Sequence, residues 1–181
     1  MPMFRGLVIA SAVGADKVHM DFWNGSEGDI LVRSLKTFPV RSVAVTGVLA
    51  IRLALQRTTA VGTTGTAATA ESTSLTAPTL AALDAEKGLS IPSGISMRAA
   101  PGGGATAGAL LAVREMFMEE TASYGDLQEF ISNPWQDKGL IVHNGSGLRL
   151  VQSSVASVGS FHIEIEFETA VLLPSRQRQN G

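Results

Sequence analysis

The chain contains no cysteine, which excludes a disulfide framework and a metal site with thiolate ligands. Charged residues make up only 17% of its 181 residues, and 14 basic against 16 acidic side chains leave a net charge of −2. Binding of nucleic acid through a strongly basic surface is therefore not expected. No membrane span is expected, because no apolar run approaches the roughly 18 residues of a membrane helix. The apolar run 6–13 is short and follows a single arginine, so we do not expect a signal peptide.

Residues that carry chemistry are equally scarce. The chain has three histidines, His19, His143 and His162, and none has the His-x3-His or His-Glu-x-x-His spacing of a zinc site. No Gly-x-Ser-x-Gly elbow occurs, and no Gly-Lys-Ser/Thr follows the glycines at 102–104. The sequence therefore predicts no enzyme, no catalytic residue, no metal and no cofactor.

The clearest pattern is an alternation of apolar and polar residues in FHIEIEFET, near the end of the chain. Such alternation predicts a strand with one face in the core. The apolar face holds Phe161, Ile163, Ile165 and Phe167, and the polar face holds His162, Glu164, Glu166 and Glu168. Because the glutamates repel one another, we expect Arg149, Arg52 or a neighbouring subunit to place cations nearby. A metal site among the histidine and glutamates of this face is the less favoured interpretation.

Further segments alternate in the same way. LAIRLALQR (Leu49–Arg57) and VHMDFW (Val18–Trp23) predict half-buried strands. The alternation places on the apolar face Leu49, Ile51, Leu53 and Leu55 of the first segment and Val18, Met20 and Phe22 of the second, with His19, Asp21 and Trp23 on the polar face. Turn-forming pairs such as Asn24-Gly25 and Asn144-Gly145 separate the strand-like segments. This pattern predicts an all-β fold, an antiparallel β-sandwich or a jelly-roll-like arrangement, in one domain over residues 1–181. Residues 1–12 are expected to form either a contact arm or the first strand.

Two regions depart from the strand pattern. Residues 61–104 begin with a stretch rich in Thr, Ala, Gly and Ser, Val61–Thr79, which has little to bury, so we expect a long loop excursion. TLAALDAEKG (Thr79–Gly88) and SYGDLQEFIS (Ser123–Ser132) each predict a short helix. The sandwich is thus expected to carry long Gly/Thr-rich loops and one or two short helices.

The segment GLIVHNGSGLRLVQ, Gly139–Gln152, could be a catalytic loop around its histidine or two strands that meet at a tight turn. Asn144-Gly145 lies between two apolar runs, and both residue types tolerate a positive φ, which predicts a β-hairpin. No acid or nucleophile stands beside His143 in the sequence. We therefore expect His143 to be dispensable for any chemistry.

Three stretches give the chain a resemblance to a known family. They are MDFWNGSEGDILVRSLK, LALQRTTAVGTTGTA, and KGLIVHNGSGLRLVQSS followed by GSFHIEIEFE. With an Asn-Gly turn after an aromatic strand, a Thr- and Gly-rich loop, and a closing hairpin and strand, they resemble the decoration, or cement, proteins of tailed-bacteriophage heads.

The resemblance implies a β-rich subunit that binds the outside of assembled major capsid protein as a homotrimer and stabilises the shell. It implies a place on the capsid exterior of the virion after synthesis in the host cytoplasm, and it transfers no catalytic residue. The candidate contact residues come from small or apolar segments that a lone domain would struggle to cover, and from scattered aromatics. They are Met3, Phe4, Trp23, Val61, Thr63, Thr64, Thr66 and Trp135.

Three other interpretations stay open. A tail or baseplate component would share the structural role. A carbohydrate-binding β-sandwich would need an exposed aromatic platform from Trp23, Tyr124 or Trp135. An enzyme that uses the acidic face beside His162 would need a bound metal or a buried carboxylate.

Overall fold

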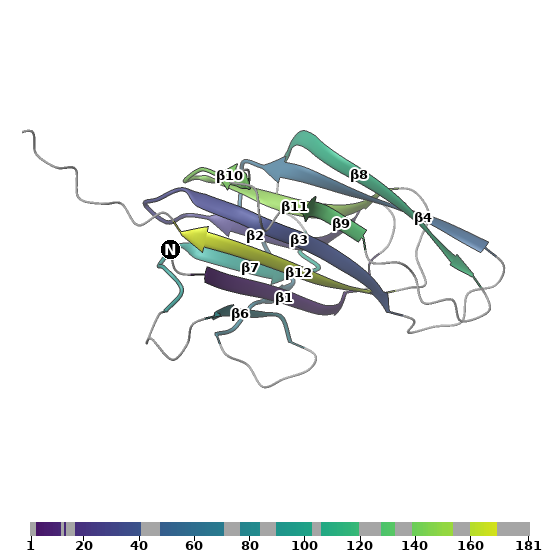
Figure 1. Ribbon diagram of the computed structural model, residues 1–181, viewed down its shortest axis with the longest axis horizontal. Coiled ribbons are helices and arrows are strands. Elements are labelled where there is room, and N and C mark those ends of the chain that lie inside the picture. The colour runs from purple at the N-terminus through teal and green to yellow at the C-terminus, as the bar shows by residue number, and fades with distance from the viewer. Residues whose placement is uncertain are drawn as a thin grey trace, which may run out of the picture.

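The computed structural model describes residues 3–11, 13, 17–40, 48–70, 77–83, 90–102, 106–119, 128–132, 139–153 and 160–169. Within these residues every regular element is a β-strand, and the strands form two antiparallel six-stranded sheets that pack as a β-sandwich (Figure 1). The predicted all-β sandwich is confirmed. No helix that could cross a membrane occurs in this part of the chain.

The first sheet has the order β10-β3-β12-β1-β6, and β9 also pairs with β3. Its strands are β1 (Met3–Ser11), β3 (Ile30–Val40), β6 (Thr79–Ala82), β9 (Gln128–Ser132), β10 (Leu140–Val142) and β12 (Ser160–Thr169). β12 lies between β1 and β3, and its four predicted inward residues, Phe161, Ile163, Ile165 and Phe167, are fully buried. At the start of the chain, where a contact arm or a first strand was expected, Met3–Ser11 forms the strand β1.

The second sheet has the order β5-β7-β2-β11-β4-β8. Its strands are β2 (Lys17–Asn24), β4 (Val48–Thr58), β5 (Thr66–Ala67), β7 (Ile95–Ala99), β8 (Ala107–Glu119) and β11 (Ser146–Ser153). On β4 the side chains of Ile51, Leu53 and Leu55 are buried, as their alternation predicts. Met20 and Phe22 of β2 are buried in the same core, also as predicted.

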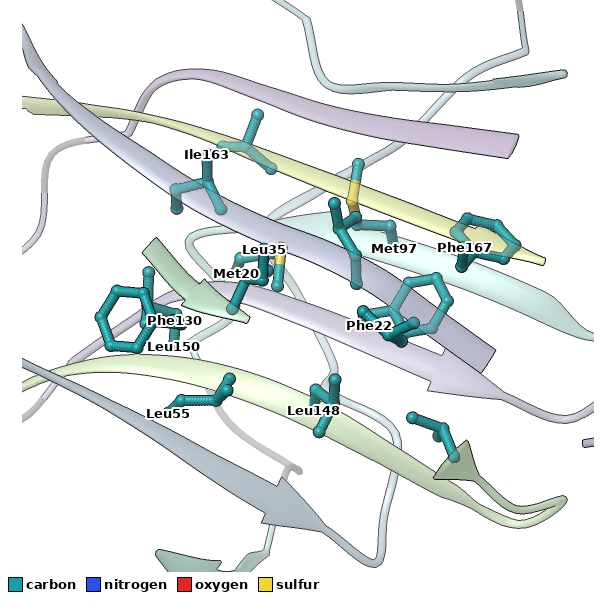
Figure 2. Packing of buried hydrophobic residues seen from close by; sticks show 14 of the residues in the cluster. Met20, Phe22, Leu35, Leu55, Met97, Phe130, Leu148, Leu150, Ile163 and Phe167 are labelled. Carbon is teal, nitrogen blue, oxygen red and sulfur yellow. The ribbon is translucent and has the colours of Figure 1, made fainter. Parts of the chain in front are cut away.

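The core joins the two sheets through side chains from both. Figure 2 shows inward residues of β2, β4, β7 and β11 facing those of β3, β9 and β12. Phe167 of β12 stacks on Phe4 at a ring-centroid distance of 5.4 Å and lies 4.9 Å from Phe22 of the opposite sheet. This aromatic contact fixes one end of β12 against β2.

His19 is buried although the alternation placed it on the polar face of its strand. In the pairing of β2 with β11, Met20 lies opposite Leu150 and Val18 opposite Val151, so His19 is the extra residue of a β-bulge. Such a bulge reverses the direction of a side chain. His19 Nε2 lies 3.1 Å from Gln152 Oε1, and the ring contacts Phe161 edge-on at 5.1 Å. His19 therefore packs into the core with its polar atom paired.

The two predicted helices are wrong for the residues that the structure describes. Thr79–Ala82 forms β6, which pairs with β1, and Gln128–Ser132 forms β9, which pairs with β3. The remainders, 84–88 and 123–127, lie outside the described residues. A helix this short gains little from its own hydrogen bonds, whereas a neighbouring strand offers a full ladder. Tertiary pairing thus outweighs the local helix propensity of these segments.

The expected loop excursion over residues 61–104 is also wrong in part, because the region contributes β5, β6 and β7. β7 pairs with β2 over its whole length and buries Ile95 and Met97. The apolar–polar alternation of β7 covers only five residues and follows a low-complexity stretch. The sequence pattern therefore did not indicate a strand there.

The Asn144-Gly145 turn forms, but it does not close a hairpin. Gly145 has a φ of 71°, and Ser146 N donates to His143 O over 3.1 Å across the turn. However, β10 pairs with β3 in the first sheet, and β11 pairs with β2 and β4 in the second. The turn therefore carries the chain from one sheet to the other. Local turn chemistry specifies the reversal of direction but not which strands then pair.

Candidate contact surface

The loop Thr59–Gly65, here called the Gly62 loop, lies against the outer face of the second sheet. Its anchor is Asp21 of β2, which points away from the core because Met20 and Phe22 point into it. The backbone N–H of Gly62 donates to Asp21 Oδ2 over 2.5 Å. Asp21 is only 1% exposed, so the loop covers a carboxyl group on what would otherwise be an open sheet face.

Two arginines flank this buried carboxyl group. Arg98 of β7 and Arg149 of β11 lie directly opposite Asp21 on its two neighbouring strands. Burial raises the pKa of Asp21 above its ordinary value of 3.8, while the Gly62 hydrogen bond and the two arginines act to lower that pKa. Desolvation also lowers the pKa of Arg149, and Asp21 opposes that change. Asp21 Oδ1 has no hydrogen-bond partner among the described residues. Burial of this oxygen therefore costs free energy of folding.

The Gly62 loop is held in a strained conformation. A Cβ atom on Gly62 would lie 2.6 Å from Asp21 Oδ2 and 3.0 Å from Pro101 Cβ, so the close approach requires glycine. Thr64 has a φ of 60°, which is unusual for a β-branched residue. Arg98 Nη1 donates to Thr64 O over 3.2 Å, and Gly102 N donates to Thr64 Oγ1 over 2.8 Å. Strain held by several contacts in this way is common at functional sites.

This arrangement presents four of the predicted contact residues at the surface. Val61, Thr63, Thr64 and Thr66 are all exposed, and Val61 keeps 41% of its surface accessible. The exposure of these residues agrees with the sequence expectation, and their role in contact stays a prediction. Asp21 could not be identified as their anchor from the sequence, because a single acid that alternates with apolar residues resembles any solvated strand position.

The other predicted contact residues are not gathered with them. Phe4 is buried against Phe167, so its assignment as a contact residue is wrong; the alternation of β1 turns it into the core. Met3 is half-buried at the start of β1, opposite Glu168. Trp23 is half-buried on β2, and Trp135 lies outside the described residues.

The acidic face of β12 has its own cations within the first sheet. Glu168 pairs with Arg33 of β3 over 2.9 Å, Lys36 lies opposite Glu164, and Arg5 lies opposite Glu166. The expectation that Arg149 or Arg52 serves this face is wrong, because both belong to the second sheet. Arg149 donates to Gln56 and Arg52 pairs with Glu115. The glutamates of β12 therefore lie beside basic residues of β1 and β3.

No catalytic constellation emerges from the described residues. They contain no group of three or more His, Asp or Glu side chains placed to bind a metal ion. His143 Nδ1 lies 3.0 Å from Asp29 Oδ1, but both side chains are more than half exposed. An open depression of about 490 Å³ adjoins this end of the sandwich, between residues 25–29, residues 92–94 and Thr169. None of its described lining residues is aromatic.

No protein family, curated protein or solved structure matches the chain.

Proposed function

We propose that the chain is a non-enzymatic decoration protein that binds the exterior of an assembled phage head as a homotrimer and bridges major capsid protein subunits. The Gly62 loop is the observation that carries this proposal. A lone domain gains nothing evident from holding small, uncharged side chains outward on a strained loop above a buried carboxyl group. A binding partner, by contrast, meets a loop that is already ordered in the folded chain. Binding therefore does not include the entropy cost of ordering that loop.

The stabilising mechanism is mass action. A subunit that bridges neighbouring capsid proteins binds the intact shell and loses contacts when the shell separates. Its binding free energy therefore adds to the stability of the assembled state. Val61 and Thr63 of the Gly62 loop and Thr66 of β5 are exposed and suit such a contact, because burying them removes no charge from water.

The carbohydrate-binding alternative has less support. Trp23 is half-buried, and the open depression near Asp29 has no aromatic residue in its described lining on which a sugar ring could stack. A tail or baseplate component would use the same kind of contact surface. The two roles differ in the partner, which is a tail protein in one case and the major capsid protein in the other. The test must therefore use heads rather than whole virions.

The test is the thermal rupture of expanded, empty heads assembled from the major capsid protein of the same genome. With the protein at saturating occupancy, we expect the rupture temperature to rise and the protein to sediment with the heads. Equal rupture temperatures with and without bound protein would rule out the cement role. Sedimentation with tails but not with heads would support the tail alternative.

A matched pair of variants connects the effect to the loop. Val61→Asp places a charge on the Gly62 loop, and Leu83→Asp places one at a similarly exposed apolar residue beyond β6, where the accessible fractions are 41% and 40%. We expect Val61→Asp to weaken head binding at least tenfold and Leu83→Asp to leave it unchanged. Equal effects of the two substitutions would remove the loop from the contact.

A further inference from the structure

β8 is the long open edge of the sandwich. The described strands at the other edges, β5, β6, β9 and β10, have two to five residues, whereas β8 has 13 and pairs with β4 alone among the described strands (Figure 1). Short edge strands protect a sheet against unwanted pairing, and a long edge strand lacks that protection. β8 therefore needs another means of covering its free side.

The first half of β8, Ala107–Val113, is apolar, and all of it is exposed except Ala112, which is half-buried against the core. Its residues include neither a charge nor a proline, the two usual protections of an edge. Ala107–Leu111 are exposed one after another, and 58% of Leu110 is accessible. Consecutive exposure along a strand means that both of its faces are open. Ala107–Val113, here called the β8 apolar segment, thus contains the longest run of exposed apolar residues that the structure describes, Ala107–Leu111.

The next two residues of β8 differ, because Arg114 and Glu115 are charged and have partners within the chain. Glu115 pairs with Arg52 of β4. Arg114 donates to Glu129 O over 3.1 Å and lies over the Phe130 ring, which links β8 to β9. Arg114 and Glu115 are therefore engaged in the fold of the monomer, whereas β4 is the one described strand that pairs with the β8 apolar segment.

We infer that the β8 apolar segment is the surface through which copies of this chain associate, and that its occupant is a second copy. This inference rests on the self-association in the proposed function and names the surface that carries it. An uncharged segment complements its own copy, because symmetric contact brings no like charges together. A partner with a charged strand would instead bury charge without compensation.

A bulge favours a closed assembly over an open fibre. Across β4, Leu55 lies opposite Ala112 and Gln56 opposite Leu110, so Leu111 has no partner in the ladder. A bulge twists the strand and interrupts the regular hydrogen-bonding edge that a further sheet would need. The copies therefore meet through the leucine side chains around a symmetry axis, not by continuing the sheet.

The first test is the mass of the purified full chain in solution, measured by light scattering over a range of concentrations. We expect wild type to form a closed oligomer and Leu110→Asp to fall to the monomer mass of 18.9 kDa with an unchanged circular dichroism spectrum. Ile141→Asp is the control, since Ile141 is 46% exposed on the edge strand β10 of the other sheet, and it should remain oligomeric. An oligomeric Leu110→Asp, or equal disruption by the control, would overturn the inference.

A second test avoids the added charge. Because the chain has no cysteine, Leu110→Cys and Ile141→Cys each introduce a single thiol. Under mild oxidation we expect Leu110→Cys to form an intermolecular disulfide at least tenfold faster than Ile141→Cys; equal rates would contradict the proposed surface. A wild type that is monomeric at all concentrations would overturn both this surface and the proposed trimer. Head stabilisation is judged separately by the rupture temperature, and an oligomer that does not raise it leaves the β8 surface intact.

Discussion

Asp21 Oδ2 accepts a hydrogen bond from the backbone N–H of Gly62, which lies 41 residues away in the sequence. The contact connects the middle of the second sheet to an exposed loop, and the acceptor is a carboxyl group removed from water. The conformation of the loop and the protonation of this carboxyl group are therefore linked, because the hydrogen bond is strongest to the ionised form while burial opposes ionisation.

The free energy of unfolding should depend on the protonation of Asp21. Burial raises its folded-state pKa above the ordinary value of 3.8, so between those two pKa values the folded chain binds more protons than the unfolded chain. The contribution of Asp21 to stability is thus fully present below pH 3.8 and is lost as the pH rises through the folded pKa. Urea denaturation across this range should show the decline.

Asp21→Asn provides the control for that pH dependence. The variant keeps the shape and an acceptor for Gly62 N–H but cannot titrate. The stability of wild type minus that of Asp21→Asn should therefore decrease as the pH rises through the folded pKa of Asp21, and level off above it. A difference that stays constant, or that increases with pH, would contradict the raised pKa.

Ile165→Asp should destabilise the domain severely. Ile165 is fully buried in the central strand β12, so the substitution places a charge in the core, at a cost of about 4 kcal/mol or more. Glu164→Gln, on the opposite face of the same strand, should cost less than about 1 kcal/mol. Urea denaturation measures both; a core charge tolerated as well as the surface change would invalidate the assignment of faces.

The faces of the long strands could be predicted from the sequence because alternation over eight or more residues is a local signal. The inward positions of β12 and β4 are confirmed on that basis. The pairing of strands could not be predicted from the sequence, because it depends on which distant segments pack their apolar faces together in the core. The same Asn144-Gly145 turn suits a hairpin or a crossing between sheets, and only the core decides between them.

The candidate site could be predicted only in part. Exposed residues of the Gly62 loop stand out by their composition, which is small and uncharged. Their anchor Asp21 does not stand out in the sequence. It is buried by the Gly62 loop, which lies 41 residues away in the chain and packs against β2. Likewise the exposure of Leu110 follows from the place of β8 at the edge of its sheet, a fact of topology that no window of sequence contains.

Gly145→Val should cost about 1–2 kcal/mol, the penalty for a side chain at a positive φ. No atom lies within 4 Å of the position of the added Cβ, so the penalty comes from the backbone and not from a clash. Gly145→Asn should cost less, because asparagine tolerates this conformation. Thermal unfolding of the two variants gives the comparison, and a valine variant as stable as wild type would be inconsistent with the turn.

His143→Ala should change stability by less than about 1 kcal/mol, because the pair that His143 forms with Asp29 is exposed to solvent. The same variant should keep head binding and assembly intact. Loss of any activity in a well-folded His143→Ala protein would show that this histidine has a chemical role.

Gly62→Ala should loosen the Gly62 loop while leaving the sandwich folded. The added methyl group would lie 2.6 Å from Asp21 Oδ2, so the loop must move off its anchor, at a cost of about 1–3 kcal/mol. Hydrogen exchange should accelerate at Thr63–Gly65, and Thr59→Ala, an exposed change in the same loop, should leave exchange as in wild type.

A double-mutant cycle tests whether the cost of Gly62→Ala comes from its contact with Asp21 or from a change elsewhere in the Gly62 loop. Asp21→Ala removes the oxygen that the new methyl group would strike, so Gly62→Ala should cost less in the Asp21→Ala background than in wild type. We expect a coupling of about 0.5–3 kcal/mol between the two positions, measured by urea denaturation. Additive costs would mean that Asp21 does not hold the loop, and the surface that presents Val61 and Thr63 would then need another explanation.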